Sequence, residues 1–106
     1  MKIRYVVALT AALSVSTAAL AAGSGEALYK QNSCMSCHAI DKKTVGPSLK
    51  DIAAKYAGDK TAQAKLEKKT RNGGSGAFGT MPMPATPKTV SDADIKAIVA
   101  WILSLK

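Results

Sequence analysis

The chain is poor in the residues that usually bind metal ions. Its 106 residues include only two cysteines, Cys34 and Cys37, and a single histidine, His38. A structural zinc site normally takes four protein ligands. These three residues leave the fourth position empty, and Asp41 would be a poor ligand there. The scarcity of ligands therefore argues against a zinc-stabilised domain.

Large apolar side chains are also scarce. Beyond residue 21, leucine, isoleucine, valine and phenylalanine make up 14 of 85 residues, about 16%, while 13 basic and 7 acidic residues give a net charge of +6. Such a composition normally indicates disorder, yet the segments are patterned for packing. Small domains with a thin core commonly rely on a metal, a disulfide or a cofactor. We therefore expect a non-protein group to complete the interior.

The chain has no long stretch in which apolar and polar residues alternate, which argues against a β-sheet. Four segments instead have the residue spacing of short helices: 25–33, 48–57, 60–72 and 92–105. The expected N-caps of the first, third and fourth are Ser24, Asp59 and Ser91. The fourth segment has the strongest apolar stripe, so we expect it to pack across the first.

A segment without helical or strand pattern separates the last two predicted helices. Residues 73–90, GGSGAFGTMPMPATPKTV, include four glycines and three prolines, which prevent a regular element from persisting. Unstructured segments of this length are usually functional or disordered. Two methionines and a phenylalanine argue against disorder, so we expect this loop to contact an apolar group.

The first residues have the pattern of a secretory signal peptide. Lys2 and Arg4 precede an apolar run over 5–13, and small residues then lead to a cleavage site after Ala21. The alternative is a membrane anchor, but hydroxyl residues interrupt the run and leave it short for a bilayer. The pattern predicts a cleaved signal peptide, residues 1–21, and one domain, residues 22–106, that works in a bacterial periplasm.

The stretch CMSCH, residues 34–38, has two further interpretations. A dithiol redox centre normally belongs to a βαβ context, and no strand pattern precedes Cys34. C-x-x-C-H is also the attachment signature of c-type haem. On a helical turn Cys34, Cys37 and His38 project to one side, so that both thiols can join the vinyl groups of a porphyrin and the imidazole can reach the iron. A haem would also replace the missing core, and we favour this interpretation.

Several longer stretches carry a family resemblance: YKQNSCMSCHAIDKKTVGPSLKDIAAKYAG, then RNGGSG, GTMPMP and the closing AWILSLK. Together they make the chain resemble a short class I cytochrome c, the small bacterial periplasmic monohaem type. The resemblance implies an all-α fold of four to five short helices wrapped around one covalently bound haem c. It also implies thioether bonds at Cys34 and Cys37 and proximal iron ligation by His38.

The resemblance implies further site residues. Met83 corresponds to the distal iron ligand, and the carbonyl of Pro47 to the acceptor of the proximal ring N–H. Arg71 corresponds to a basic residue that pairs with a haem propionate, and Trp101 to a core aromatic of the haem environment. The chain departs from the family where Phe78 replaces a common tryptophan, and where the segment after the ligand is longer and lacks an asparagine.

The residues themselves also favour Met83 over the other methionines. Met35 lies between the attachment cysteines and cannot reach the opposite haem face. Met81 and Met83 are two residues apart, so in an extended segment only one of them faces the ring. Pro82 and Pro84 flank Met83 and reduce the entropy lost when the loop is ordered. Met81 is expected to pack as an apolar filler.

These features predict a periplasmic one-electron carrier whose iron cycles between Fe(II) and Fe(III) with His/Met ligation, and not an enzyme. Two alternatives remain: a haem enzyme or gas sensor with a labile sixth ligand, and a haem-bearing subunit of a larger reductase or oxidase. Expected partners are periplasmic or membrane redox proteins with acidic docking surfaces, because the chain is basic. We expect a monomer that binds neither nucleic acid nor a small-molecule substrate.

Overall fold

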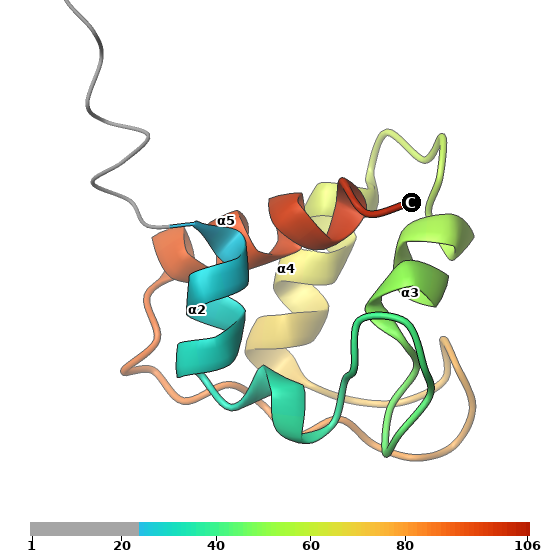
Figure 1. The fold of residues 1–106 in the computed structure, drawn as a ribbon. Helices are drawn as coiled ribbons and strands as arrows, with labels where there is room; N and C mark the ends of the chain where they lie inside the picture. The colour runs from blue at the N-terminus through green and yellow to red at the C-terminus, as the bar shows by residue number, and fades with distance from the viewer. Residues whose placement is uncertain (1–23) are drawn as a thin grey trace, which may run out of the picture.

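The structure, a computed structural model, describes residues 24–106 and contains four α-helices in that range. They are α2 (Gly25–Gln31), α3 (Leu49–Lys55), α4 (Ala62–Asn72) and α5 (Asp92–Leu103), with a short 3₁₀ helix, η1 (Cys34–Ser36), after α2 (Figure 1). The described residues contain no strand, only one isolated antiparallel bridge. The predicted all-helical fold is thus confirmed. The predicted signal peptide, residues 1–21, lies outside the described residues.

Serine side chains begin three of the helices. The hydroxyl oxygens of Ser24, Ser48 and Ser91 accept hydrogen bonds of 3.0–3.1 Å from the backbone N–H three residues later. Each of these bonds satisfies an N–H group that has no partner within its own helix.

None of the helices in residues 24–106 is long and apolar enough to cross a bilayer.

The predicted cap of the third helix was wrong by two residues. The N-cap of α4 is Thr61, which makes no side-chain capping bond. Asp59 instead accepts hydrogen bonds from the backbone N–H and the hydroxyl of Thr61, at 2.8 and 2.6 Å, and from Lys65 Nζ at 3.0 Å. A short acidic side chain readily forms such a local turn, and the helix then begins only at Ala62.

The first and last helices cross at close range, as predicted (Figure 1). A Cβ atom on Gly25 would overlap with the carbonyl oxygen of Ala97 and with Cβ of Trp101, so the crossing requires glycine there. The rings of Tyr29 and Trp101 pack beside it with centroids 5.2 Å apart. The main core cluster is small and comprises Leu28, Tyr29, Leu49, Ile52 and Ile98.

Two segments without regular α-helix lie at one end of the molecule. They are the stretch that joins η1 to α3 and the loop that joins α4 to α5, and both run below the helices in Figure 1. The fold thereby brings the CMSCH stretch and the Gly/Pro-rich loop to the same cavity.

Candidate haem-binding site

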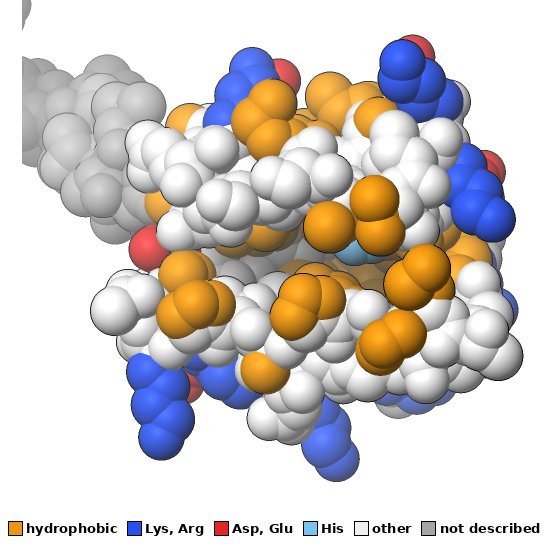
Figure 2. Space-filling model, turned by 90° about the horizontal axis from the view of Figure 1, so that it is seen from below, with side chains coloured by type: hydrophobic (Ala, Val, Ile, Leu, Met, Phe, Trp, Pro, Cys, Tyr) orange, Lys and Arg blue, Asp and Glu red, His pale blue; other side chains and the backbone are white. Residues whose placement is uncertain are grey.

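A cavity of about 760 Å³ lies between these two segments. Figure 2 looks into the hollow, which apolar side chains surround. Its apolar walls come from α3, α4 and α5 and comprise Leu49, Ile52, Leu66, Ile98, Val99 and Ile102. Cofactor sites are typically concave, largely apolar and about 300–1,000 Å³ in volume. The missing part of the core is therefore a space of cofactor size.

The CMSCH stretch folds as a tight turn at the cavity. The backbone N–H groups of Cys37 and His38 both donate to the carbonyl oxygen of Cys34, at 3.2 and 3.0 Å. Ser33, just before the turn, adopts a left-handed conformation with φ of 62°. As a result, Cys34, Cys37 and His38 all line the cavity.

The environment of Cys34 does not suit a dithiol redox centre. Burial raises the pKa of the Cys34 thiol, and the nearby Cys37 raises it further. A reactive redox cysteine needs the opposite shift, because the thiolate is the nucleophile. The described residues also contain no group of three or more His, Cys, Asp and Glu side chains arranged to hold a metal ion.

Pro47 orients the imidazole of His38. The Nδ1 atom of His38 lies 2.8 Å from the carbonyl oxygen of Pro47. A carbonyl oxygen can only accept a hydrogen bond, so Nδ1 carries a proton in this arrangement, and in the neutral imidazole the lone pair is then on Nε2. Metal-binding histidines commonly donate their second ring N–H to a backbone carbonyl in this way.

Three further residues hold the CMSCH turn, and the sequence reasoning missed them. A Cβ atom on Gly46 would stand 2.6 Å from Cε1 of His38, so only glycine fits under the ring. The hydroxyl of Thr44 donates to the carbonyl of Cys37 at 2.7 Å. The buried phenol of Tyr29 donates to the carbonyl oxygen of His38. Of the three, only Tyr29 could have been found from the sequence, because a phenol expected to be buried needs a hydrogen-bond partner.

Two glycines fix the backbone of Met83. The N–H and carbonyl of Gly74 exchange two hydrogen bonds of 2.9 Å with Met83, which form the isolated bridge. Gly73 has a φ of 70°, and a Cβ atom there would overlap with the carbonyl oxygen of Met83. Met83 is half-buried at the cavity, whereas the side chain of Met81 at the same cavity is 68% exposed.

The structure places Arg71 differently from the expected propionate partner. Its guanidinium donates to the carboxylate of Asp92 and to the carbonyls of Pro87 and Val90, and Arg71 does not line the cavity. The side chain extends from α4 toward the segment before α5, where these acceptors occupy its N–H groups. The basic residues that do line the cavity are Lys43 and Lys69.

Trp101 and Phe78 also differ in their relation to the cavity. Trp101 does not line it and packs against Tyr29 and the main core cluster. Phe78 does line it, and the ammonium of Lys55 lies 4.9 Å from the centre of its ring. Trp101 therefore supports the site from behind, through Tyr29 and the core cluster, and does not line the cavity itself.

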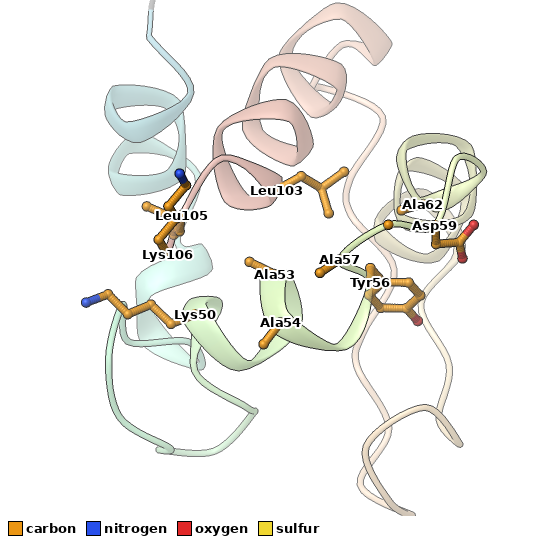
Figure 3. Close-up of a pocket in the computed structure, with 11 residues that line it drawn as sticks. Lys50, Ala53, Ala54, Tyr56, Ala57, Asp59, Ala62, Leu103, Leu105 and Lys106 are labelled. Carbon is orange, nitrogen blue, oxygen red and sulfur yellow. The ribbon is translucent and has the colours of Figure 1, made fainter.

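A second hollow of about 540 Å³ lies beside the C-terminal end of α3. Alanines of α3 and leucines near the C-terminus line much of it, and its charged residues are Lys50, Asp59 and Lys106 (Figure 3). No cysteine, histidine or methionine is among its lining residues. The chemically reactive side chains therefore belong to the larger cavity, which we take as the candidate site.

Comparisons with known proteins agree with this geometry. The family model described as cytochrome c matches residues 22–106. Cytochrome c-551 of Pseudomonas aeruginosa is 47% identical to this chain over 81 residues, which cover 76% of each protein. Cytochrome c-552 of Nitrosomonas europaea is 50% identical over 93 residues, which cover 85% of this chain and 89% of that protein. The crystal structure of wild-type Nitrosomonas europaea cytochrome c552 superposes with a TM-score of 0.72 at 51% identity, covering 76% of this chain and 99% of that one.

The residues present fit a covalently bound haem. Two thiols and an imidazole oriented through its Nδ1 line an apolar cavity of cofactor size, and a methionine is held by the loop that lines the same cavity. The geometry, the match of the family model and the likeness to solved structures lead to one conclusion: this chain belongs to the cytochrome c family.

Proposed function

We propose that this protein shuttles single electrons between redox proteins of a bacterial periplasm. Membership of the cytochrome c family confirms two predictions, one covalently bound haem c and a function in electron transport. When bound, the haem supplies the one-electron couple between Fe(II) and Fe(III). The proposal extends to the residues that hold it and to the compartment.

We assign Cys34 and Cys37 to the thioether bonds and His38 and Met83 to the two axial positions. The observation that carries this assignment is that His38 and Met83 line one cavity and that backbone groups hold both. The carbonyl of Pro47 orients His38, and Gly74 fixes the backbone of Met83. An iron with two protein ligands changes geometry little between oxidation states and leaves no position for a substrate.

The charged residues of the cavity lining do not favour a haem enzyme. Among its lining residues, only Lys43, Asp51 and Lys69 carry charged side chains, and the chain's single histidine is already assigned to the iron. A general acid or base would have to lie within hydrogen-bond reach of a substrate at the open axial position. Lys69 already donates to the carbonyl of Ser75 at 3.1 Å.

The face around the cavity fits transient docking. Val45, Phe78 and Met81 are exposed large apolar side chains at its mouth. Lysine and arginine side chains lie toward the periphery of this face in Figure 2. A partner that presents an apolar contact surrounded by acidic residues would complement both features. We propose that such redox proteins bind the monomeric protein here.

The N-terminal sequence pattern and the bacterial relatives support a periplasmic location. Residues 1–21 have the pattern of a cleaved signal peptide, and the relatives named above are bacterial proteins. We propose that the mature protein begins after Ala21 and works in the periplasm.

Carbon monoxide tests the carrier against the enzyme or sensor. The reduced haem protein is mixed with carbon monoxide at neutral pH and its visible spectrum is followed. An unchanged spectrum supports a closed sixth position and the carrier function. An immediate change would show an exchangeable ligand and would favour the haem enzyme or gas sensor.

A further inference from the structure

Arg71 connects the end of α4 to most of the segment between Met83 and α5. Its NH1 donates to the carbonyl of Pro87 at 3.2 Å, with a longer contact of 3.5 Å to the carbonyl of Thr86. Its NH2 donates at 2.7 Å to the carbonyl of Val90 and to the carboxylate of Asp92. One side chain thus fixes four residues of the segment that follows Met83.

The neighbouring residue of α4 adds to this attachment. The backbone N–H and the hydroxyl of Thr86 both donate to the carbonyl oxygen of Thr70, at 3.2 and 2.6 Å. On the other side of Met83, Thr80, Met81 and Pro82 are exposed. Met83 itself is bonded to Gly74; beyond that bridge, the chain is held by α4 on the C-terminal side of Met83 and is exposed on its N-terminal side.

We propose that Arg71 is a positioning residue for the distal methionine. By fixing residues 86–92 against α4, it limits how far Met83 can withdraw from the cavity. This inference rests on the proposed function, because it takes Met83 as an iron ligand. It assigns Arg71 an effect on the strength of ligation through the loop and not through contact with the haem.

The backbone carbonyls, and not the ion pair, carry this effect. The side chain of Asp92 is 94% exposed, whereas that of Arg71 is only 24% exposed. Exposed ion pairs contribute little to stability, while a hydrogen bond from a charged donor to a part-buried carbonyl, here above all that of Val90, contributes more. A guanidinium fork can serve several acceptors in a fixed geometry, which the single ammonium of a lysine cannot do.

The test compares four variants of the full haem protein: Arg71→Gln, Arg71→Lys, Asp92→Asn and, as a matched control, Lys68→Gln. Lys68 is an exposed residue of the same helix, so its replacement removes the same charge without the contacts. Two quantities are measured well below the unfolding temperature: the rate at which the reduced protein takes up carbon monoxide, and the weak red absorption of the ferric iron–sulfur bond as the pH is raised. Far-ultraviolet circular dichroism verifies that each variant is folded.

Arg71→Gln should take up carbon monoxide at least roughly tenfold faster than the wild type. The variant lacks the hydrogen bonds that keep the loop closed in the wild type. The red absorption should disappear at a lower pH than in the wild type. Arg71→Lys should behave like Arg71→Gln, while Asp92→Asn and Lys68→Gln should stay within about twofold of the wild type.

Three results would overturn the inference while leaving the proposed function intact. One is an uptake rate in Arg71→Gln equal to that of Lys68→Gln, and another is full rescue by Arg71→Lys, which would show that charge alone matters. The third is a changed pH dependence of the reduction potential in Arg71→Gln while its carbon monoxide uptake stays unchanged. That result is expected if Arg71 pairs with a haem propionate. A wild-type protein that lacks the red absorption and binds carbon monoxide at once would overturn the proposed function and the inference together.

Discussion

The phenol of Tyr29 donates a hydrogen bond to the carbonyl oxygen of His38, so the first helix holds the backbone of the residue assigned to the iron. Tyr29→Phe would leave that part-buried carbonyl without its donor, and the free energy of unfolding should fall by about 1 kcal/mol. For a domain of this size, the melting temperature should fall by roughly 4–8 °C. Tyr56→Phe serves as the control, because its hydroxyl makes no hydrogen bond within residues 24–106. Equal melting temperatures for the two variants would show that the Tyr29 bond contributes nothing.

Removing the attachment cysteines should unfold the chain. Cys34→Ala and Cys37→Ala should each keep one thioether, and the double variant should keep none. Because the space left in the core is of cofactor size, the double variant should lose most of its helical circular dichroism. Mass spectrometry reports the attached haem. A haem-free double variant with native helix content would contradict the view that the cofactor completes the core.

The two loop methionines should differ in their effect on the iron. Met83→Ala should abolish the weak red absorption of the ferric protein, admit carbon monoxide to the reduced protein and lower the reduction potential. Met81→Ala should keep the absorption and cost little stability, since that side chain is 68% exposed. The opposite pattern would place Met81 on the iron.

Acid should weaken the start of α4 through Asp59. Hydrogen bonds from the side chain and backbone of Thr61, together with Lys65, lower the pKa of Asp59 from its ordinary 3.8 to about 2. Because the folded state has the lower pKa, these bonds stabilise it fully above the unfolded pKa and are lost as the pH falls from 3.8 toward 2. Denaturant unfolding should show wild type and Asp59→Asn converging at low pH. A stability difference that stays constant from neutral pH down to pH 2 would contradict this role.

Electron exchange with an acidic redox protein should slow as salt is added. The lysines that give the described residues their positive surface include Lys42, Lys43, Lys50, Lys65, Lys68 and Lys88, which are exposed, and Lys69, which is half-buried. The Debye length falls to about 8 Å at physiological ionic strength, which weakens long-range attraction. Stopped-flow rates for Lys43→Gln, at the cavity, should fall more than those for Lys96→Gln, which does not line it. Rates that are independent of salt would indicate docking through apolar contacts alone.

Local patterns predicted the helices and several of their ends. Ser24 and Ser91 cap the helices they were expected to cap, because an N-cap depends on a hydroxyl and a backbone N–H only three residues apart. The prediction of Asp59 as an N-cap is wrong because the same side chain can instead close a turn with Thr61. Sequence spacing does not distinguish between these two short-range options.

The partners of Arg71 were beyond the reach of local patterns. Apart from the carboxylate of Asp92, its acceptors are backbone carbonyls 15 to 19 residues further along the chain, and every residue has such a carbonyl. The role of Gly46 was equally hidden, because it depends on the distance between a backbone and the ring of His38. By contrast, a C-x-x-C-H stretch defines its own geometry within five residues, and the structure brings its cysteines and histidine to one cavity.

The close crossing at Gly25 imposes an order of events on maturation. Helix α2 has no packing partner at this position until the chain as far as Trp101 is in place. The CMSCH stretch, which follows α2 directly, therefore remains outside any finished fold during that interval. The thiols are therefore accessible before α5 docks, and docking of α5 against α2 completes the core cluster that packs against Cys34.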